Sequence, residues 1–168
     1  MKAEVDLVYN PHKYQAEIHE KLKRFSVLVC HRRFGKTFLA IATLIDAAIS
    51  TDRENLRFGY VAPFQKQAKQ VAWDYLKQFA LPIHGTVANE SETSITFLNG
   101  ARIRLYGSDN SQAMRGLYFD GVVCDEIADF RPETWPEIIR PALTDSHHKG
   151  WCLFIGTPKG LNQFYDLY

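Results

Sequence analysis

The clearest structural signal in the chain is an octapeptide, Cys30-His31-Arg32-Arg33-Phe34-Gly35-Lys36-Thr37. It matches the phosphate-binding pattern Gly-x-x-x-x-Gly-Lys-[Ser/Thr] at every fixed position but the first, where Cys30 replaces glycine. An apolar run at 25–30 predicts a buried strand before it, and 36–50 predicts a helix that is apolar almost all round. A strand, a glycine-containing loop and a helix in this order predict a phosphate-binding loop at a helix N-terminus.

The residues of this loop suit distinct roles at a phosphate. Lys36 would reach the β- and γ-phosphates, the Thr37 hydroxyl would ligate Mg²⁺, and Gly35 would let the backbone approach without a Cβ in the way. Arg32 and Arg33 are either solvated charges or a source of positive field at the phosphates. A Gly-Lys-Thr alone also fits a helix start with an exposed lysine, so the assignment depends on further sites.

A second site follows a second apolar run, in Gly121-Val122-Val123-Cys124-Asp125-Glu126. A strand that ends in two carboxylates needs a reason, because burying an unpaired charge is costly. In P-loop ATPases the first acid holds Mg²⁺ and the second polarises the attacking water, and Asp125 and Glu126 fit these roles. The alternative is an acidic turn that faces solvent. The order and spacing of the two sites favour an ATPase.

A third site ends another apolar run, in Phe154-Ile155-Gly156-Thr157-Pro158. In P-loop motors that act on nucleic acid, a serine or threonine at this place senses the γ-phosphate and relays its loss. Gly156, Thr157 and Pro158 are therefore candidate coupling residues, although a plain Gly-Thr-Pro turn is the simpler alternative.

The rest of the sequence predicts one α/β domain over 1–168, a P-loop NTPase of the ASCE/RecA-like kind with a mostly parallel sheet flanked by helices. Asn99-Gly100 between two strand-like runs predicts a β-hairpin at 93–106. Cys30, Asp125 and Thr157 should lie near strand ends at one edge of the sheet. The strand ending at Ile155 should separate the P-loop strand from its outer neighbours. Further strands are expected at 57–62, 121–124 and 151–155, helices at 64–79 and 132–143, and a polar loop at 108–116.

Composition limits the function classes only loosely. The 168 residues carry a formal net charge of +1, which indicates no particular partner and does not exclude DNA binding along one face. The three cysteines lie in or beside apolar runs without metal-ligand spacing, which predicts core residues in a reducing compartment. No secretory signal or membrane span is expected. The apolar final segment, 164–168, leads us to expect that the chain continues into a larger protein.

Together these motifs resemble the ATPase half of a terminase large subunit from tailed phages. The resemblance covers essentially the whole chain. Tyr14-Gln15 is similar to the family's adenine-side motif, and 32–37 to a deviant Walker A that often lacks its first glycine and carries an arginine. Residues 123–128 resemble the family's Walker B, and 106–116 resemble the segment that precedes it. Residues 155–160 resemble the family's coupling motif.

The resemblance implies a motor that couples ATP hydrolysis to translocation of double-stranded DNA into a procapsid. It implies ATP and Mg²⁺ as cofactors, a ring homo-oligomer, and a portal protein and terminase small subunit as partners in the host cytoplasm. Glu126, Arg115 and Lys36 are the implied catalytic residues, with Arg115 a finger that reaches a neighbouring subunit's ATP; Arg32 or Arg33 could supply that charge instead. The implied nucleotide-binding residues are Tyr14, Gln15, Arg32, Arg33, Phe34, Gly35, Lys36 and Thr37, with Thr37 and Asp125 at the metal. No residue is assigned to the family's nuclease domain.

Two alternatives remain at this point. A superfamily 2 helicase fragment shares the upstream glutamine and the Asp-Glu pair, but favours Ser-Ala-Thr where this chain has Gly156-Thr157-Pro158. A truncated prophage remnant would fold and bind nucleotide without turnover. The surface that contacts DNA stays open, with Lys66, Lys69, Arg102 and Arg104 as candidates.

Overall fold

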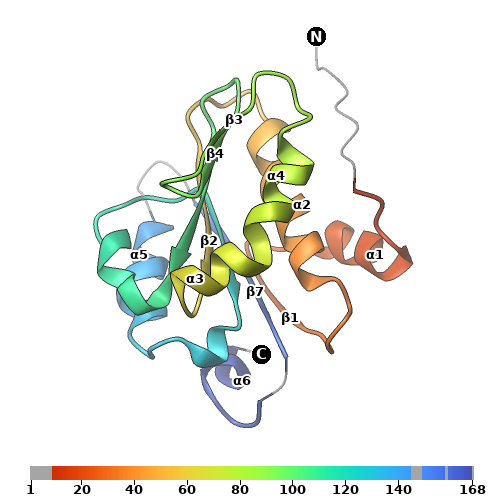
Figure 1. Cartoon of the computed structure of the whole chain (residues 1–168). Helices are drawn as coiled ribbons and strands as arrows, with labels where there is room; N and C mark the ends of the chain where they lie inside the picture. Colours follow the sequence, from red (N-terminus) through yellow and green to blue (C-terminus); the bar gives the residue numbers. More distant parts are fainter. Residues whose placement is uncertain (1–8, 145–148, 158, 168) are drawn as a thin grey trace.

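The structure is a computed structural model that describes residues 9–144, 149–157 and 159–167 (Figure 1). Its centre is a seven-stranded sheet in the order β1-β7-β6-β2-β5-β4-β3. The first five strands in this order are parallel to one another, and the last two pair antiparallel. Their bounds are β1 Phe25–Val29, β2 Arg57–Ala62, β3 Val87–Asn89, β4 Ser94–Thr96, β5 Arg102–Gly107, β6 Gly121–Asp125 and β7 Trp151–Gly156.

The predicted fold class, a mostly parallel α/β sheet with a hairpin, is confirmed. β7 lies between β1 and β6, so the strand that ends near Ile155 separates the P-loop strand from the others, as expected. The hairpin joins β4 to β5 through Asn99-Gly100, where Gly100 takes a φ of 77°. β3 was not predicted, because it is only three residues long and two of them are exposed.

Helices cover both faces of this sheet (Figure 1). On one face lie α2, α3 and α4, and a π-helical segment joins α3 to α4. On the other lie a 3-10 helix, a second π-helical segment and α5. Their bounds are α1 Lys13–Lys21, α2 Lys36–Ile49, α3 Gln65–Ala68, η1 Lys69–Trp73, α4 Asp74–Ala80, η2 Ser108–Met114, η3 Ile127–Asp129, η4 Thr134–Ile139, α5 Arg140–Ala142 and α6 Gln163–Leu167.

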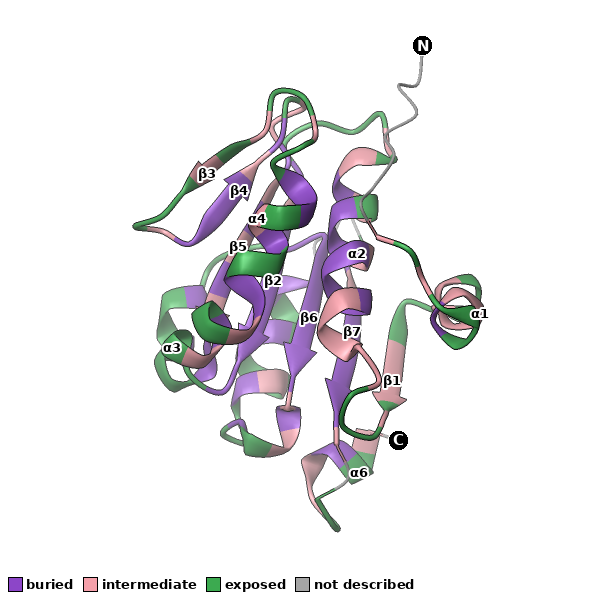
Figure 2. Ribbon diagram, turned by 45° about the vertical axis from the view of Figure 1, so that its right-hand side comes forward, coloured by how far each residue is buried: buried purple, intermediate pink, exposed green. Residues whose placement is uncertain are grey.

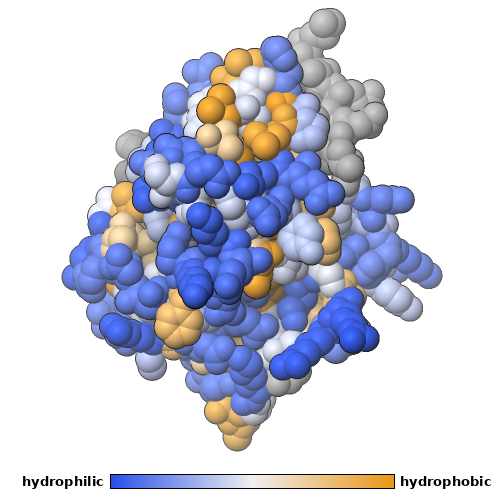
Figure 3. Space-filling model, viewed as in Figure 1, coloured by the Kyte–Doolittle hydropathy of each residue, from blue (hydrophilic) through white to orange (hydrophobic). Residues whose placement is uncertain are grey.

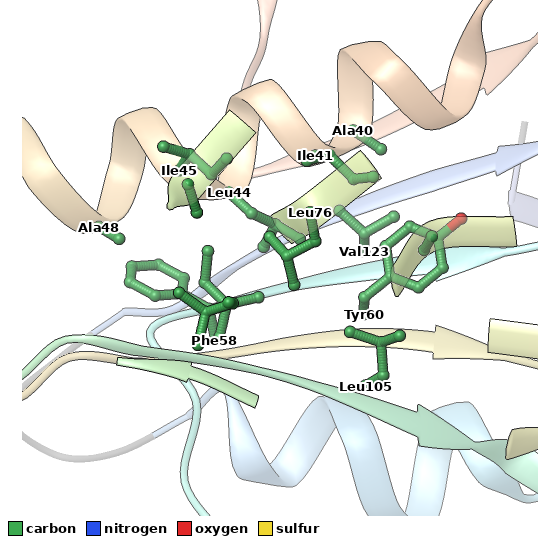
Figure 4. Close-up of a cluster of buried hydrophobic side chains, with 14 of the residues drawn as sticks. Ala40, Ile41, Leu44, Ile45, Ala48, Phe58, Tyr60, Leu76, Leu105 and Val123 are labelled. Atoms are coloured by element: carbon green, nitrogen blue, oxygen red, sulfur yellow. The ribbon is translucent and has the colours of Figure 1, made fainter. Parts of the chain in front are cut away.

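Side chains that alternate along the central strands pack into two hydrophobic cores, one on each face of the sheet. Tyr60 and Val123 enter the core under α2 and α4, whereas their chain neighbours Val61 and Val122 enter the core on the other face. Figure 4 shows the first of these cores, in which Ile41, Leu44 and Ile45 of α2 pack against the sheet residues. A strand that is apolar on both faces is what a helix-covered parallel sheet requires. This packing fixes α2, and with it the P-loop, on the sheet.

Three predictions about local structure were wrong in detail: a buried strand at 25–30, a core position for Cys30 and a plain loop at 108–116. The run 25–30 is not a fully buried strand: β1 lies at the sheet edge, where Phe25 is 42% and Val29 40% exposed, and Cys30 is only partly buried (Figure 2). An apolar run does not encode whether neighbours cover it on both sides. The segment 108–116 is not a plain loop but contains η2, because Ser108, Ser111 and Met114 are buried at a three-residue spacing.

The helical predictions at 64–79 and 132–143 are confirmed in type, but each contains a π-helical stretch. Among the residues that the structure describes, no helix combines the length and the apolar character that crossing a bilayer requires.

Candidate active site

The three predicted motifs meet at the carboxyl ends of β1, β7 and β6. Val29 pairs with Gly156 in register, and Asp125 pairs with Ile155. Just beyond the strands, the Cys30 N–H donates to the Gly156 carbonyl at 3.2 Å and the Glu126 N–H donates to the Ile155 carbonyl at 2.8 Å. The predicted convergence at one edge of the sheet is confirmed, and it is the place where α/β proteins bind ligands.

The loop between β1 and α2 has the backbone of a phosphate cradle. Gly35 caps α2 in the left-handed conformation with a φ of 83°, and Arg33 also has a positive φ, of 67°. The Lys36 ammonium turns back over the loop, donates to the Cys30 carbonyl at 3.2 Å and lies 3.9 Å from the Glu126 carboxylate. Arg32 and Arg33 are exposed at the tip of the loop. The Lys36 charge thus lies between the start of the loop and the Glu126 carboxylate.

Asp125 is a buried carboxylate with one close neutral partner. The Tyr60 hydroxyl donates to its Oδ2 at 2.5 Å, and the Thr37 side chain lies close enough to that hydroxyl to lower its pKa. Burial raises the pKa of Asp125 to about 6, with a smaller upward contribution from Glu126, while the Tyr60 hydrogen bond and Lys36 act in the opposite direction. Burial also raises the pKa of Tyr60 well above its usual value.

Tyr60 therefore lies beside both residues predicted to hold Mg²⁺, bonded to Asp125 and near Thr37. Sequence reasoning missed it, although a tyrosine within the apolar run 57–62 is a signal, because a buried phenol needs a hydrogen-bond partner. A carboxylate and a hydroxyl are the hard oxygen ligands that Mg²⁺ prefers. Asp125 and Thr37 thus fit a magnesium site that the phosphates of a nucleotide would complete.

Glu126, like Arg33, has a left-handed backbone, with a φ of 55° that is uncommon outside glycine. Its carboxylate accepts from the Thr157 N–H at 3.4 Å and from the Thr157 hydroxyl at 3.3 Å. Lys159 lies 3.7 Å from it and also pairs with Asp129 at 2.5 Å. Thr157 of the predicted coupling segment therefore contacts the predicted catalytic carboxylate directly. Lys159 was quoted in the motif but given no role by the sequence, and Pro158 lies outside the described residues.

The upstream residues Tyr14 and Gln15 lie beside the loop in different environments. Gln15 is 5% exposed, and its side-chain amide donates to the carbonyls of Phe34 and Gly35. Tyr14 is 65% exposed and lines a cleft of about 620 Å³ between α1 and β1, to which Cys30 and Phe34 also contribute. The position of Tyr14 leaves its ring accessible to a ligand.

Arg115 stands apart from these residues. It follows η2 in an exposed segment between β5 and β6, where its N–H donates to the Gln112 carbonyl. Within the part of the chain that the structure describes, its guanidinium has no ion-pair partner. Among the described residues, no hydrogen bond or ion pair joins its side chain to residues 30–37.

The candidate DNA-contact residues differ in availability. Arg102 pairs with Glu92, and Arg104 lies over the Tyr106 ring at 5.4 Å, so both are engaged within the chain. Lys66 and Lys69 are exposed on α3 and the π-helical segment after it, on a face that is largely hydrophilic (Figure 3).

The raised pKa of Asp125 predicts a pH effect on stability in the absence of metal. The folded state binds the proton more tightly than the unfolded chain, whose carboxyl has its ordinary pKa of 3.8. Stability is therefore lost as pH rises through the window from 3.8 to about 6. A shift of this size corresponds to about 3 kcal/mol. Urea unfolding in EDTA should show that the free energy of unfolding of the Asp125→Asn variant rises relative to that of the wild type as pH increases across this window. Parallel pH curves for the two proteins would contradict the assignment.

Comparison with known proteins gives consistent similarities. A family model described as "Terminase large subunit, T4likevirus-type, N-terminal" matches residues 29–168. The chain is 26% identical to the terminase large subunit of Thermus phage G20c over 179 residues, which covers 96% of this chain and 36% of the relative. It is 27% identical to the terminase large subunit of Escherichia phage T5, covering 86% of this chain and 33% of the relative. The chain thus spans about a third of the length of these relatives.

Solved structures agree with the sequence comparisons. The large terminase ATPase domain of Thermus phage P74-26 superposes with a TM-score of 0.80 and 26% identity, covering 95% of this chain and 70% of that one. The HK97 bacteriophage large terminase has a TM-score of 0.71 at 13% identity, covering 89% and 33%, which shows a shared fold.

Proposed function

The chain belongs to the terminase large subunit family, in its T4-like N-terminal class, and on that premise we propose that it binds and hydrolyses Mg²⁺-ATP as part of a phage DNA-packaging motor. The observation that carries the proposal is the meeting of Lys36, Asp125, Glu126 and Thr157 at one edge of a parallel sheet. The related Thermus phage P74-26 structure is itself named an ATPase domain. Membership of this family sets the helicase alternative aside.

The chemistry assigns one task to each side chain. Lys36, which now contacts Cys30 and Glu126, would turn to the β- and γ-phosphates, and Thr37 and Asp125 would hold Mg²⁺. The ion would neutralise charge on the phosphates. Glu126 would accept a proton from the water that attacks the γ-phosphorus, as the bond from that phosphorus to the bridging oxygen breaks. Thr157, hydrogen-bonded to Glu126, would report phosphate loss to the rest of the protein.

We further propose the setting that the family implies. The chain would be the ATPase part of a longer protein whose nuclease lies elsewhere. That protein would form a ring in the host cytoplasm, with a portal protein and a small subunit as partners, and would move double-stranded DNA into a procapsid. Supply of Arg115 by the neighbouring subunit would complete each active site.

Steady-state ATP turnover, measured with and without duplex DNA, tests the proposal. The isolated chain should bind Mg²⁺-ATP but turn it over slowly, because the proposed Arg115 finger comes from a neighbouring subunit. The longer protein should hydrolyse ATP, and duplex DNA should accelerate it. A longer protein that binds nucleotide without turnover under either condition would instead be the non-enzymatic remnant.

Removing the Lys36 ammonium should abolish detectable ATP binding. The charge makes contacts to the ground-state phosphates, and each charge-assisted contact is worth about 1.5–3 kcal/mol, so two predict an affinity loss of at least about a hundredfold. Calorimetric titration of Lys36→Ala with Mg²⁺-ATP measures the loss. Lys69→Ala, an exposed lysine in the segment after α3, is the matched control and should bind as the wild type does. Unchanged affinity in Lys36→Ala would rule out the P-loop as the binding site.

A further inference from the structure

Tyr60 is a core residue whose hydroxyl has a carboxylate as its partner. The side chain is 1% exposed and belongs to the core under α2. Its hydroxyl donates to Oδ2 of Asp125 at 2.5 Å, a length typical of a hydrogen bond from a hydroxyl to an ionised carboxylate. Such bonds are roughly twice as strong as those between neutral groups. This contact therefore ties one oxygen of Asp125 to the core.

The register of the sheet explains why a tyrosine makes this contact. Tyr60 pairs with Val123 of the neighbouring strand β6, and both side chains enter the same core (Figure 4). Side chains two residues apart in a strand lie on one face, so Asp125 follows Val123 on that face, about 7 Å further along. The phenol ring spans this distance and carries its hydroxyl at the far end. A phenylalanine would fill the same space without bonding the carboxylate.

The two partners differ in how firmly their own surroundings hold them. The Tyr60 ring is enclosed by a close-packed core that includes Ile41 of α2 and Leu105 of β5. Asp125 is the last residue of β6, and the terminal torsion of an aspartate is broad, so packing alone leaves its carboxylate free to rotate. The hydrogen bond from the fixed hydroxyl removes that freedom.

Holding Oδ2 leaves the other oxygen of Asp125 for a metal ion. Among the described residues, no side chain donates a hydrogen bond to Oδ1. Mg²⁺ demands near-octahedral geometry and combines one or two carboxylates with phosphate oxygens and water, so a carboxylate that offers one oxygen in a fixed direction suits it. Thr37, the other predicted ligand, lies near the same hydroxyl. Tyr60 thus stands behind both ligands.

We propose that Tyr60 is a positioning residue for the metal, which holds Oδ2 of Asp125 so that Oδ1 is presented to Mg²⁺. The proposal rests on the Mg²⁺-nucleotide site proposed above and deepens it. Outer partners that hydrogen-bond a ligating carboxylate are typically worth 10–100-fold in metal affinity. It follows that Tyr60 strengthens the metal-dependent part of nucleotide binding and leaves the metal-free part alone.

The test measures the affinity for a non-hydrolysable ATP analogue by calorimetry, once in excess Mg²⁺ and once in EDTA. By linkage, the ratio of the two affinities reports how much more tightly Mg²⁺ binds the protein-bound nucleotide than the free nucleotide. Tyr60→Phe should lower this ratio by about 10–100-fold, with the affinity in EDTA unchanged. Tyr106→Phe makes the same substitution on the neighbouring strand β5, beside the other core, and should leave the ratio at its wild-type value.

A double variant separates positioning through Asp125 from a role in packing. Asp125→Ala alone should lower the ratio at least as far as Tyr60→Phe does. Because Tyr60 acts through Asp125, adding Tyr60→Phe to Asp125→Ala should lower the ratio no further. Independent losses that add in the double variant would show that Tyr60 contributes by another route, and would overturn the inference.

The remaining outcomes separate this inference from the proposed function. A Tyr60→Phe protein that melts as the wild type does and keeps the wild-type ratio would overturn the inference. Equal losses of affinity in Mg²⁺ and in EDTA would overturn it as well, since they indicate damage to the loop and not to the metal site. If Mg²⁺ leaves the affinity of the wild type unchanged and Asp125→Ala has no effect on the ratio, the proposed magnesium site fails, and the role of Tyr60 fails with it.

Discussion

In the longer protein, Arg115→Ala and Glu126→Gln subunits are each expected to be inactive alone, and mixing them is expected to restore part of the ATPase activity. Hydrolysis builds negative charge on the γ-phosphoryl oxygens, and an arginine supplied to them is worth about 10³–10⁵ in rate. Arg115 is exposed and lies between β5 and β6, outside the cluster formed by Lys36, Asp125 and Glu126. A neighbouring subunit is the site to which it is free to contribute.

A ring that contains both variants tests whether Arg115 of one subunit acts at the active site of its neighbour. An interface that pairs Glu126 of an Arg115→Ala subunit with Arg115 of a Glu126→Gln subunit has both groups intact. Arg140→Ala, another exposed arginine on the same side of the sheet, is the matched control and should remain active alone. No recovery in rings shown to contain both subunits would contradict the trans assignment and favour Arg32 or Arg33 at the tip of the P-loop.

The second large effect is expected from Glu126→Gln alone. Because glutamine keeps the shape but cannot take a proton, ATP should still bind while kcat falls by about 10²–10⁴, the usual contribution of a general base. Single-turnover hydrolysis and a separate ATP titration measure the two properties independently. Asp129→Asn removes a nearby carboxylate that pairs with Lys159 but does not contact Thr157, and serves as the control. Unchanged turnover in Glu126→Gln would show that another group activates the water.

Much of the fold could be predicted because its decisive signals are local. The octapeptide at 30–37 and the acidic pair after an apolar run marked the ends of β1 and β6 before any contact was known. The Asn99-Gly100 dipeptide likewise encodes a turn within its own backbone. The order β1-β7-β6 followed from the fold class that these motifs indicate.

What the sequence did not reveal depends on partners far apart in the chain. The exposure of β1 reflects its position at the sheet edge, which the run 25–30 does not encode. Tyr60 gains its role only when β2 is placed beside β6, because that neighbour supplies Asp125. The contacts of Gln15 with the P-loop similarly depend on where α1 packs. Pair distances of this kind require the three-dimensional structure.

Backbone amide chemical shifts, followed during a titration with Mg²⁺ and a non-hydrolysable ATP analogue, report directly whether nucleotide binds at the loop 30–37. We expect one saturable site, with the largest shifts at the amides of Gly35, Lys36 and Thr37, and further shifts at Glu126 and Thr157. These are the residues that the structure gathers at the ends of β1, β6 and β7. Saturable shifts confined to other parts of the chain, with the amides of Gly35, Lys36 and Thr37 unmoved, would contradict it.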